Sequence, residues 1–546
     1  MTRKPETRTK TLDFQLILQL LYQMRRLFSA SSTAIPKIFD VVIIGGGVVG
    51  AALAARLSAL PSLRSTSICL VEARAAAPVP LPGTPVDART YALSPTSISF
   101  LESSNSWAPV AASNRLKQFN KMSVWDSCGP ARLSWSAPTV GGSLGTMVEH
   151  TTLAGVLWNR LETLALESRI TLKSGARVGG PPMTLTGLTL PTSPAGGLAS
   201  LTLSDGSTLQ ARLVVGADGG ASATRTLAGG AAWGGDYPTQ RAVVDIVRVT
   251  GEEDTTTTAT TATTKSTAFQ RFLPDGPLAL LPMWDNLASV VWSTTPEHAK
   301  LLSSLSPQEF ALAVDTALHA DESSFDNGGN GNGGGDPGAQ PIYLSPSMTL
   351  ATMARAAASV IRSATPASPM PTPPRISALT TATNTTTTTT TTATSSKRAV
   401  IPLRLAFADA LVRPRLALIG DAARSFHPLA GQGLNQGLLD AAALVNAVET
   451  AIRTGADAGS PRALQEYAAA RSVSGASAAR GVDAILRLWS GRPEVALGSD
   501  LGARAPSGLW KRGGLIPALR DLALAALDVS PKGKEFLSDA AGARSS

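Results

Sequence analysis

One short segment near the start of the chain constrains the fold more than any other. A β-rich apolar run covers residues 39–44, and an Ala- and Leu-rich stretch of helical composition covers 48–60. The glycines Gly45, Gly47 and Gly50 lie at their junction in the pattern G-x-G-x-x-G. A strand that passes through such a turn into a helix, and then into a second strand, forms a right-handed unit with parallel strands. The sequence therefore predicts an α/β fold.

The spacing of the glycines also points to a ligand. Gly45 allows the tight turn, Gly47 lets the backbone approach a pyrophosphate, and Gly50 permits close packing of helix against strand. The helix N-terminus then presents free N–H groups and the positive end of its dipole to phosphates. The next apolar run, 67–71, ends at Glu72, whose carboxylate can accept hydrogen bonds from ribose hydroxyls. This pattern predicts a dinucleotide cofactor, and by itself it does not choose between NAD and FAD.

Two later motifs distinguish between these two cofactors. A hairpin is expected around Asp205–Gly206, a further strand at 213–215 leads into Asp218–Gly219, and a strand at 416–419 leads into Gly420–Asp421. A helix is expected over 434–454. With all three motifs in this order, the chain resembles the FAD-dependent aromatic hydroxylases, the class A flavoprotein monooxygenases of the para-hydroxybenzoate hydroxylase type.

That resemblance implies FAD as cofactor and a role for individual residues. Asp421 would bind the ribityl chain, Asp218 would lie near the pyrophosphate, and Arg89 would reach the phosphate region. Pro428 would lie against the flavin ring, and the backbone of 431–435 would face its pyrimidine edge; no catalytic base is identified. The expected cofactor-binding residues are Gly45, Gly47, Gly50, Glu72, Arg89, Asp218, Gly420, Asp421, Pro428, Gly431, Gly433 and Asn435. The implied fold is a Rossmann-like FAD-binding domain interleaved with a mixed or antiparallel substrate domain, followed by C-terminal helices.

Residues 87–95, 122–126 and 427–437 are similar to the ubiquinone biosynthesis hydroxylases, although Arg424 stands where that family usually has His. The resemblance implies hydroxylation at ring position 5 of a polyprenylated hydroxybenzoate or phenol through a flavin hydroperoxide formed with O₂. It further implies ferredoxin and ferredoxin reductase as electron source, association with other ubiquinone biosynthesis proteins, and a peripheral position on the matrix side of the mitochondrial inner membrane. Two alternatives stay open: an NAD(P)H-dependent FAD hydroxylase of a small phenol, and an FAD-binding scaffold subunit.

The charge distribution favours a targeting signal at the N-terminus over a nucleic-acid partner. The formal net charge is +9, and residues 1–38 hold seven basic and two acidic residues, so little excess charge is left for the rest. The Arg- and Ser-rich run 24–34 resembles a mitochondrial presequence, and Met24 is a second possible start. Two cysteines, Cys69 and Cys128, and four scattered histidines predict neither a disulfide framework nor a metal site.

The remaining organisation follows from composition. Low-complexity stretches at 254–267, 326–338, 363–376 and 380–396 are expected to be flexible insertions in surface loops. An apolar channel for the prenyl tail is expected between the substrate sheet and the FAD domain. The expected parts are a leader (1–38), three FAD-binding parts (39–125, 150–230 and 401–455), two substrate-domain parts (126–149 and 231–400, the second with the insertions) and a C-terminal helical region (456–546).

Overall fold

In the computed structural model of the chain, the glycine turn follows a strand that pairs in parallel with both of its neighbours. The structure describes residues 36–127, 132–137, 142–175, 180–192, 197–250, 266–320, 357, 372–379, 398–425 and 431–472. Strand β1 (Lys37–Ile44) leads into helix α2 (Val48–Ala59), and β2 (Ile68–Glu72) pairs in parallel with β1. The β-α-β unit expected at this end of the chain is therefore confirmed.

This first sheet has eight strands among the described residues, in the order β18-β19-β11-β1-β2-β8, with β10 and β9 extending from β11. The expected hairpin is formed by β10 and β11, which pair antiparallel. The strand expected at 213–215 is the second half of β11, because that strand continues without a break to Gly216, where it pairs with β1. The further strands are β8 (Thr171–Ser174), β9 (Leu185–Thr189), β10 (Ala199–Leu203), β11 (Thr208–Gly216), β18 (Val412–Arg413) and β19 (Leu416–Leu418).

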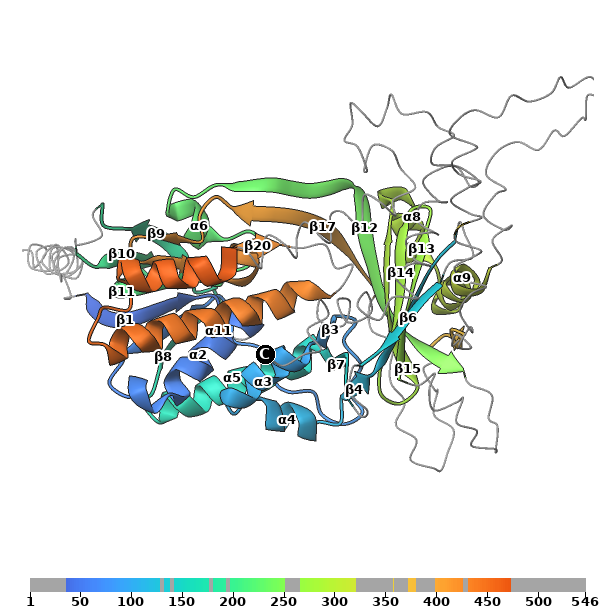
Figure 1. The fold of residues 1–546 in the computed structure, drawn as a ribbon, viewed down its shortest axis with the longest axis horizontal. Helices are drawn as coiled ribbons and strands as arrows, with labels where there is room; N and C mark the ends of the chain where they lie inside the picture. The colour runs from blue at the N-terminus through green and yellow to red at the C-terminus, as the bar shows by residue number, and fades with distance from the viewer. Residues whose placement is uncertain are drawn as a thin grey trace, which may run out of the picture.

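The second sheet has nine strands, in the order β20-β17-β12-β15-β14-β13-β5-β6, with β16 beside β12. It is mixed, as expected, because β13 pairs in parallel with β5 while its other pairs are antiparallel. In Figure 1, β12 and β17 run along one side of the molecule and connect the two large sheets. The strands are β5 (Lys121–Asp126), β6 (Arg132–Ser136), β12 (Ala232–Thr250), β13 (Thr267–Leu273), β14 (Gly276–Pro282), β15 (Leu287–Thr294), β16 (Arg375–Ser377), β17 (Ala399–Ala408) and β20 (Arg424–Ser425).

The assignment of strands to sheets can be compared with two expectations, one on a domain boundary and one on a loop insertion. Strand β5 belongs to the second sheet, so a division by sheets falls before Lys121 rather than after Trp125. The low-complexity stretch 363–376 ends inside β16, which pairs with β12, so this end is part of the sheet and not a loop insertion. The described residues otherwise exclude most of the four low-complexity stretches.

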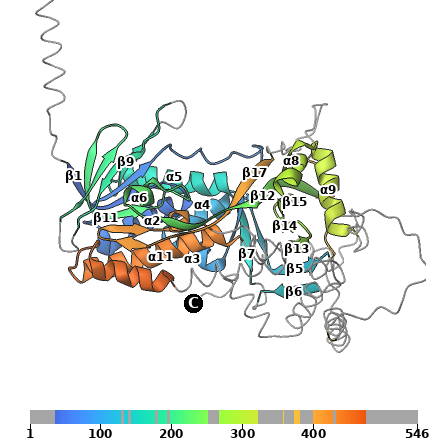
Figure 2. The same cartoon turned by 90° about the horizontal axis from the view of Figure 1, so that it is seen from above.

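A small antiparallel sheet, β3-β7-β4, lies between the two large ones. Figure 2 shows β7 between the helices of the first part and strands β13 to β15 of the second. Its strands are β3 (Thr90–Leu93), β4 (Leu116–Phe119) and β7 (Gly145–Glu149). The remaining helices are η1 (Pro61–Leu63), α3 (Pro95–Ser103), α4 (Trp107–Ala112), α5 (His150–Leu166), α6 (Ala223–Leu227), α8 (Pro296–Ser304), α9 (Pro307–His319), η3 (Gly420–Ala422) and α11 (Gln432–Arg453), with a further helical segment at 461–472.

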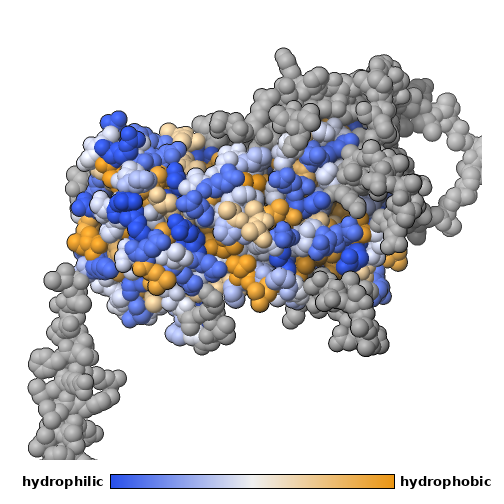
Figure 3. Space-filling model, turned by 90° about the horizontal axis from the view of Figure 1, so that it is seen from below, coloured by the Kyte–Doolittle hydropathy of each residue, from blue (hydrophilic) through white to orange (hydrophobic). Residues whose placement is uncertain are grey.

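Two apolar clusters flank the small sheet. The first contains residues of α2, α5 and α11 and one face of the small sheet, including Leu93 and Val148. The second, which we call the inter-sheet cluster, joins the other face of the small sheet to the nine-stranded sheet; it includes Phe119, Met147 and Phe272. On the surface seen in Figure 3, hydrophobic residues form small areas between hydrophilic ones.

Candidate active site

The first two sequence motifs are in backbone contact. A Cβ placed on Gly45, whose φ is +102°, would lie 2.4 Å from the carbonyl oxygen of Ala217 and 2.8 Å from Cα of Asp218. A Cβ on Gly50 would lie 1.9 Å from the carbonyl oxygen of Gly45. Glycine is therefore required at both positions, and the strand ends of β1 and β11 meet beside the start of α2.

The third motif, Gly420–Asp421, lies beside the first two motifs although it is far from them in the sequence. Gly420 has a φ of +59°, and the Ile419 N–H donates to the carbonyl of Gly216 at 2.9 Å. A Cβ on Gly437 would lie 2.7 Å from Cγ2 of Val49 and 3.2 Å from Cα of Gly420. This glycine of α11 therefore lets the helix approach both α2 and the Gly-Asp turn.

Two helices begin at this junction without a side-chain cap. Gly47 is the N-cap of α2 and Gly431 is the N-cap of α11, with a φ of +60°; neither position carries a capping hydrogen bond from a side chain. The first N–H groups of a helix lack partners inside it, so an uncapped start is suited to an anionic ligand. A Cβ on Gly47 or Gly433 would meet no atom of the described residues within 4 Å, so these residues leave room for a ligand at both helix starts. The two helix starts and the residues around them fit FAD as a ligand.

Glu72 holds the glycine turn in addition to lying at the end of β2. Its Oε2 accepts a hydrogen bond from the N–H of Gly46, and its Oε1 accepts one from the N–H of Arg74 at 3.2 Å. Each carboxylate oxygen has lone pairs for more than one donor, so the side chain retains acceptor capacity for a ribose.

The Asp218 carboxylate organises its own turn. Its Oδ1 accepts from the hydroxyl of Ser222 at 2.5 Å, and its Oδ2 accepts from the N–H and hydroxyl of Thr224 at 2.9 and 3.0 Å. Next to it, the buried Arg225 guanidinium donates to the carbonyls of Gly220 at 2.8 Å and Ala422 at 2.7 Å. Arg225 therefore ties the second motif to the third, a role that sequence reasoning missed.

Asp421 follows directly on this turn. Its side chain is open to solvent, yet desolvation by the surrounding protein raises the pKa of its carboxyl above the usual range. That combination is expected of a group in a recess, where access is limited to one direction and protein surrounds the rest. A carboxylate in this position can accept hydrogen bonds from ligand hydroxyls.

A tyrosine–histidine pair lies nearby. The Tyr91 hydroxyl and Nδ1 of His150 are 2.9 Å apart, and the two rings meet edge to face. Burial raises the pKa of Tyr91 to about 12, with the Asp421 charge adding to the increase. Burial and then the Arg89 charge lower the pKa of His150 below its usual 6.5. The hydroxyl is therefore protonated and the imidazole neutral at pH 7.

Arg89 itself extends into solvent. Its side chain is 56% exposed, and its Nε lies 3.8 Å from Oδ1 of Asp87. The loop before it is fixed by the buried Glu149, which accepts from the N–H of Asp87 at 3.1 Å and forms two hydrogen bonds with Arg115 at 2.7 and 2.8 Å. Arg89 is thus free to reach a phosphate, while the residues that position its loop were not expected from the sequence.

The Asn435 side chain joins α11 to the segment after β3. Its Oδ1 accepts from the N–H of Ser94 at 2.9 Å and the hydroxyl of Ser97 at 2.7 Å. Its Nδ2 donates to the carbonyls of Ala92 at 2.9 Å and Gly431 at 3.2 Å. The structure therefore brings together the expected residues of all three motifs, while Pro428 lies outside the described residues.

Comparisons with known proteins agree with this geometry. Residues 348–481 match the family described as FAD binding domain. The mitochondrial ubiquinone biosynthesis monooxygenase COQ6 of Xenopus tropicalis is 32% identical over 488 residues, covering 88% of this chain and 92% of that protein. The human COQ6 protein is 32% identical, covering 85% of this chain and 88% of that protein.

Solved structures show the same fold. PqsL of Pseudomonas aeruginosa in complex with 2-aminobenzoylacetate aligns with a TM-score of 0.53 at 18% identity, covering 89% of this chain and all of that one. The p-nitrophenol 4-monooxygenase PnpA of Pseudomonas putida aligns with a TM-score of 0.52 at 16% identity, covering 94% of this chain and all of that one.

The interleaved fold and the three joined motifs define an FAD-dependent monooxygenase of the class A flavoprotein type. Its expected cofactor, FAD, and its expected fold class are confirmed. Within that class, the chain belongs to the COQ6 family of ubiquinone biosynthesis monooxygenases.

Proposed function

We propose that this chain hydroxylates position 5 of the aromatic ring of a polyprenylated hydroxybenzoate or phenol during ubiquinone biosynthesis. The observation that carries the proposal is the pair of uncapped helix starts, at Gly47 and Gly431, the second of which lies beside Ala92 at the edge of the inter-sheet cluster. The helix starts suit FAD, and the cluster suits a substrate with a long hydrocarbon tail.

The residues of the three motifs would hold the cofactor. The backbone at Gly47 would accommodate the pyrophosphate, Asp421 would accept hydrogen bonds from ribityl hydroxyls, and the N–H groups after Gly431 would face the pyrimidine edge. Arg89 would reach the phosphate region, and Pro428 would lie against the ring. Bound FAD supplies the redox chemistry that activates O₂, while the protein orients it and excludes water. The uncapped start of α11 would stabilise negative charge on the ring next to it.

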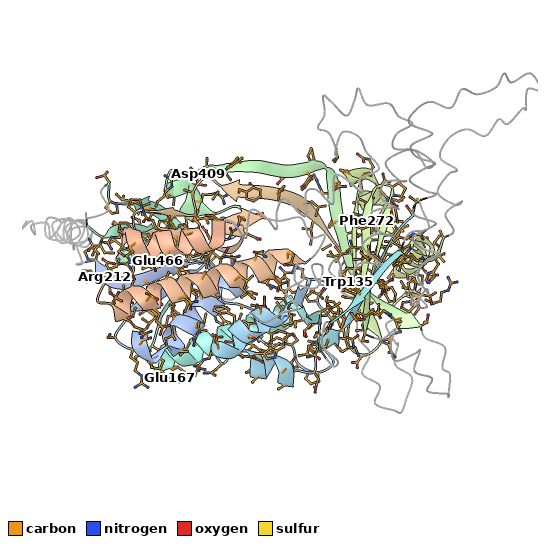
Figure 4. All side chains as sticks on the ribbon, in the orientation of Figure 1. Trp135, Glu167, Arg212, Phe272, Asp409 and Glu466 are labelled. Atoms are coloured by element: carbon orange, nitrogen blue, oxygen red, sulfur yellow. The ribbon has the colours of Figure 1, made fainter. Side chains whose placement is uncertain are left out.

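The inter-sheet cluster would form one wall of the substrate site. Its side chains come from the small sheet, β5 and β6, and the nine-stranded sheet, among them Phe119, Met147 and Phe272. Trp135, on β6, lies in this cluster; Figure 4 labels Trp135 and Phe272 on the same part of the molecule. The indole N–H of Trp135 is buried and has no hydrogen-bond partner within the described part of the chain. We propose that it donates to an oxygen of the substrate ring, since a buried donor without a partner is costly.

The cellular setting is proposed from family membership. Electrons would come from ferredoxin through ferredoxin reductase, and the chain would associate with other ubiquinone biosynthesis proteins at the matrix side of the mitochondrial inner membrane. Among the described helices, none combines the length and apolar character needed to cross a bilayer. The peripheral contact with the membrane is proposed from the family resemblance alone.

The lipid profile of a strain that lacks this protein tests the proposal. We expect loss of ubiquinone and accumulation of a prenylated precursor without the position-5 hydroxyl, reversed by the wild-type chain and not by Asp421→Ala. Normal ubiquinone in the deletion strain would contradict the proposed function. Rapid flavin reduction by NADPH alone would instead favour a hydroxylase that takes NAD(P)H directly.

A further inference from the structure

We propose that the helical segment 461–472 is part of the flavin site, which it joins through Asp440 and two buried arginines. Arg424, Arg471 and Asp440 are then positioning residues: they hold the Gly-Asp turn and place two guanidinium groups behind it. The inference rests on the proposed placement of FAD against Gly420 and Asp421.

The Asp440 carboxylate accepts hydrogen bonds on both oxygens. Its Oδ1 accepts from Nη2 of Arg424 and from Nε of Arg471, the latter at 2.7 Å. Its Oδ2 accepts from the N–H of Gly420 at 3.1 Å. One side chain of α11 therefore fixes both arginines and the backbone of the turn that precedes Asp421.

The segment 461–472 contributes two side chains to this region. Besides its contact with Asp440, Arg471 donates to Oε1 of Gln436 at 2.7 Å, and its own carbonyl accepts from Arg424 at 2.8 Å. One helical turn earlier, the buried Tyr467 hydroxyl donates to the carbonyl of Leu418 at 2.7 Å. The helix, marked by the label of Glu466 in Figure 4, lies beside α11. It therefore holds β19 and the Gly-Asp turn from behind.

The described part of this cluster contains two positive charges and one negative charge. Asp440 is 1% exposed, Arg424 is 4% exposed and Arg471 is 7% exposed, so one carboxylate faces two guanidinium groups away from water. Burial raises the pKa of Tyr467 well above its usual value, so the phenol between them adds no negative charge. Low-dielectric surroundings strengthen the field of these guanidinium groups at short range.

Arg424 explains why the cluster has this charge. It occupies the position where the resembling family usually has His, and a neutral imidazole there would leave one arginine for one carboxylate. The longer guanidinium reaches both Asp440 and the carbonyl of Arg471. A fixed positive charge behind the turn stabilises the reduced, more negative flavin over the oxidised one, which raises its midpoint potential.

The test compares purified full-length variants that keep or remove the charge. Arg471→Met and Arg424→Met remove it, whereas Arg471→Lys and Arg424→Lys keep it but lose the planar fork. Arg462→Met is the matched control, because Arg462 lies on the same helix with its side chain 91% exposed. The measurements are the dissociation constant for FAD from protein fluorescence and the midpoint potential from dye-coupled reduction, neither of which requires substrate.

We expect the Met variants to bind FAD at least tenfold more weakly and to shift the flavin potential to more negative values. The Lys variants should lose affinity but keep the potential, and Arg462→Met should match the wild type. Wild-type affinity and potential in folded Met variants would overturn the proposal. If the Met variants do not fold, the polar and neutral variant Arg424→Gln decides: an unchanged potential overturns it equally. Loss of hydroxylation with an unchanged potential would concern the proposed substrate instead.

Discussion

Replacing Gly47 with Val separates cofactor binding from folding. Gly47 is the exposed N-cap of α2, and a Cβ built on it meets no described atom within 4 Å. Its φ of −60° and ψ of 177° are accessible to valine. The expected cost to the free energy of unfolding is therefore limited to the poorer capping preference, about 1 kcal/mol.

The cost to FAD binding is larger. A valine side chain would fill the space in front of the helix and keep the pyrophosphate from the N–H groups. Hydrogen bonds to a charged group are worth about 1.5–3 kcal/mol each, so loss of two costs about 3–6 kcal/mol. At about 1.4 kcal/mol per tenfold, affinity should fall by about 10² to 10⁴-fold.

Two glycines provide controls for this experiment. Gly50→Val should prevent correct folding, because its Cβ would lie 1.9 Å from a backbone oxygen. Gly235→Val lies on β12, where a Cβ also meets nothing within 4 Å, and should leave FAD binding unchanged. Flavin absorbance after gel filtration and thermal unfolding of the apoprotein measure the two quantities. A folded Gly47→Val protein with wild-type FAD affinity would refute the placement of the pyrophosphate.

Four further experiments test the pKa shifts of three side chains and the proposed substrate contact of Trp135. Desolvation raises the pKa of Asp421, so its charged form is disfavoured in the fold; Asp421→Asn should raise the melting temperature of the apoprotein at pH 7 and weaken FAD binding, and a lower melting temperature would contradict this. The pKa of His150 is lower in the fold than its ordinary 6.5, so its contribution to stability is complete above pH 6.5 and is lost as the pH falls below it. His150→Gln should therefore reduce the drop in melting temperature between pH 7 and pH 5. Burial raises the pKa of the Cys69 thiol to about 12, so in a Cys128→Ser background a thiol reagent should label Cys69 only at the rate of unfolding. Trp135→Phe should weaken substrate binding with FAD affinity unchanged, as measured by substrate-induced changes in the flavin spectrum.

Much of the fold follows from local sequence signals. The parallel unit of β1, α2 and β2 and the hairpin of β10 and β11 were expected because glycines and apolar runs act over short distances. The mixed second sheet was expected only through a family resemblance, since the pairing of β5 with β13 joins segments about 145 residues apart. Position along the chain gives no physical signal for such a contact.

The candidate site likewise contains some residues that could be predicted from the sequence and others that could not. Gly45 and Gly50 could be interpreted from spacing, because their function depends on the missing side chain and the structure gives the clash that any other residue would make. Arg225, Arg424 and Arg471 could not, because an isolated arginine in a sequence does not disclose which carbonyl or carboxylate it will meet. Arg424 lies 16 residues from Asp440, Arg471 lies 31 residues from Asp440, and Arg225 lies 197 residues from Ala422.

The polar residues of the motifs can either contact the ligand or stabilise the backbone around it. Sequence patterns do not distinguish these two roles. Both oxygens of Asp218 accept hydrogen bonds from its own turn, and the amide of Asn435 makes four contacts within the protein. Asp421, in contrast, has an open side chain with a raised pKa. If direct contact with FAD were the common role, all three side chains should be available in the same way. The contacts therefore favour Asp421 as the residue that touches the ligand, with Asp218 and Asn435 fixing the backbone beside it. Asp421→Ala should accordingly lose FAD affinity without loss of stability, whereas Asn435→Ala should lose both, because it leaves the Ser94 N–H and the Ser97 hydroxyl without their acceptor.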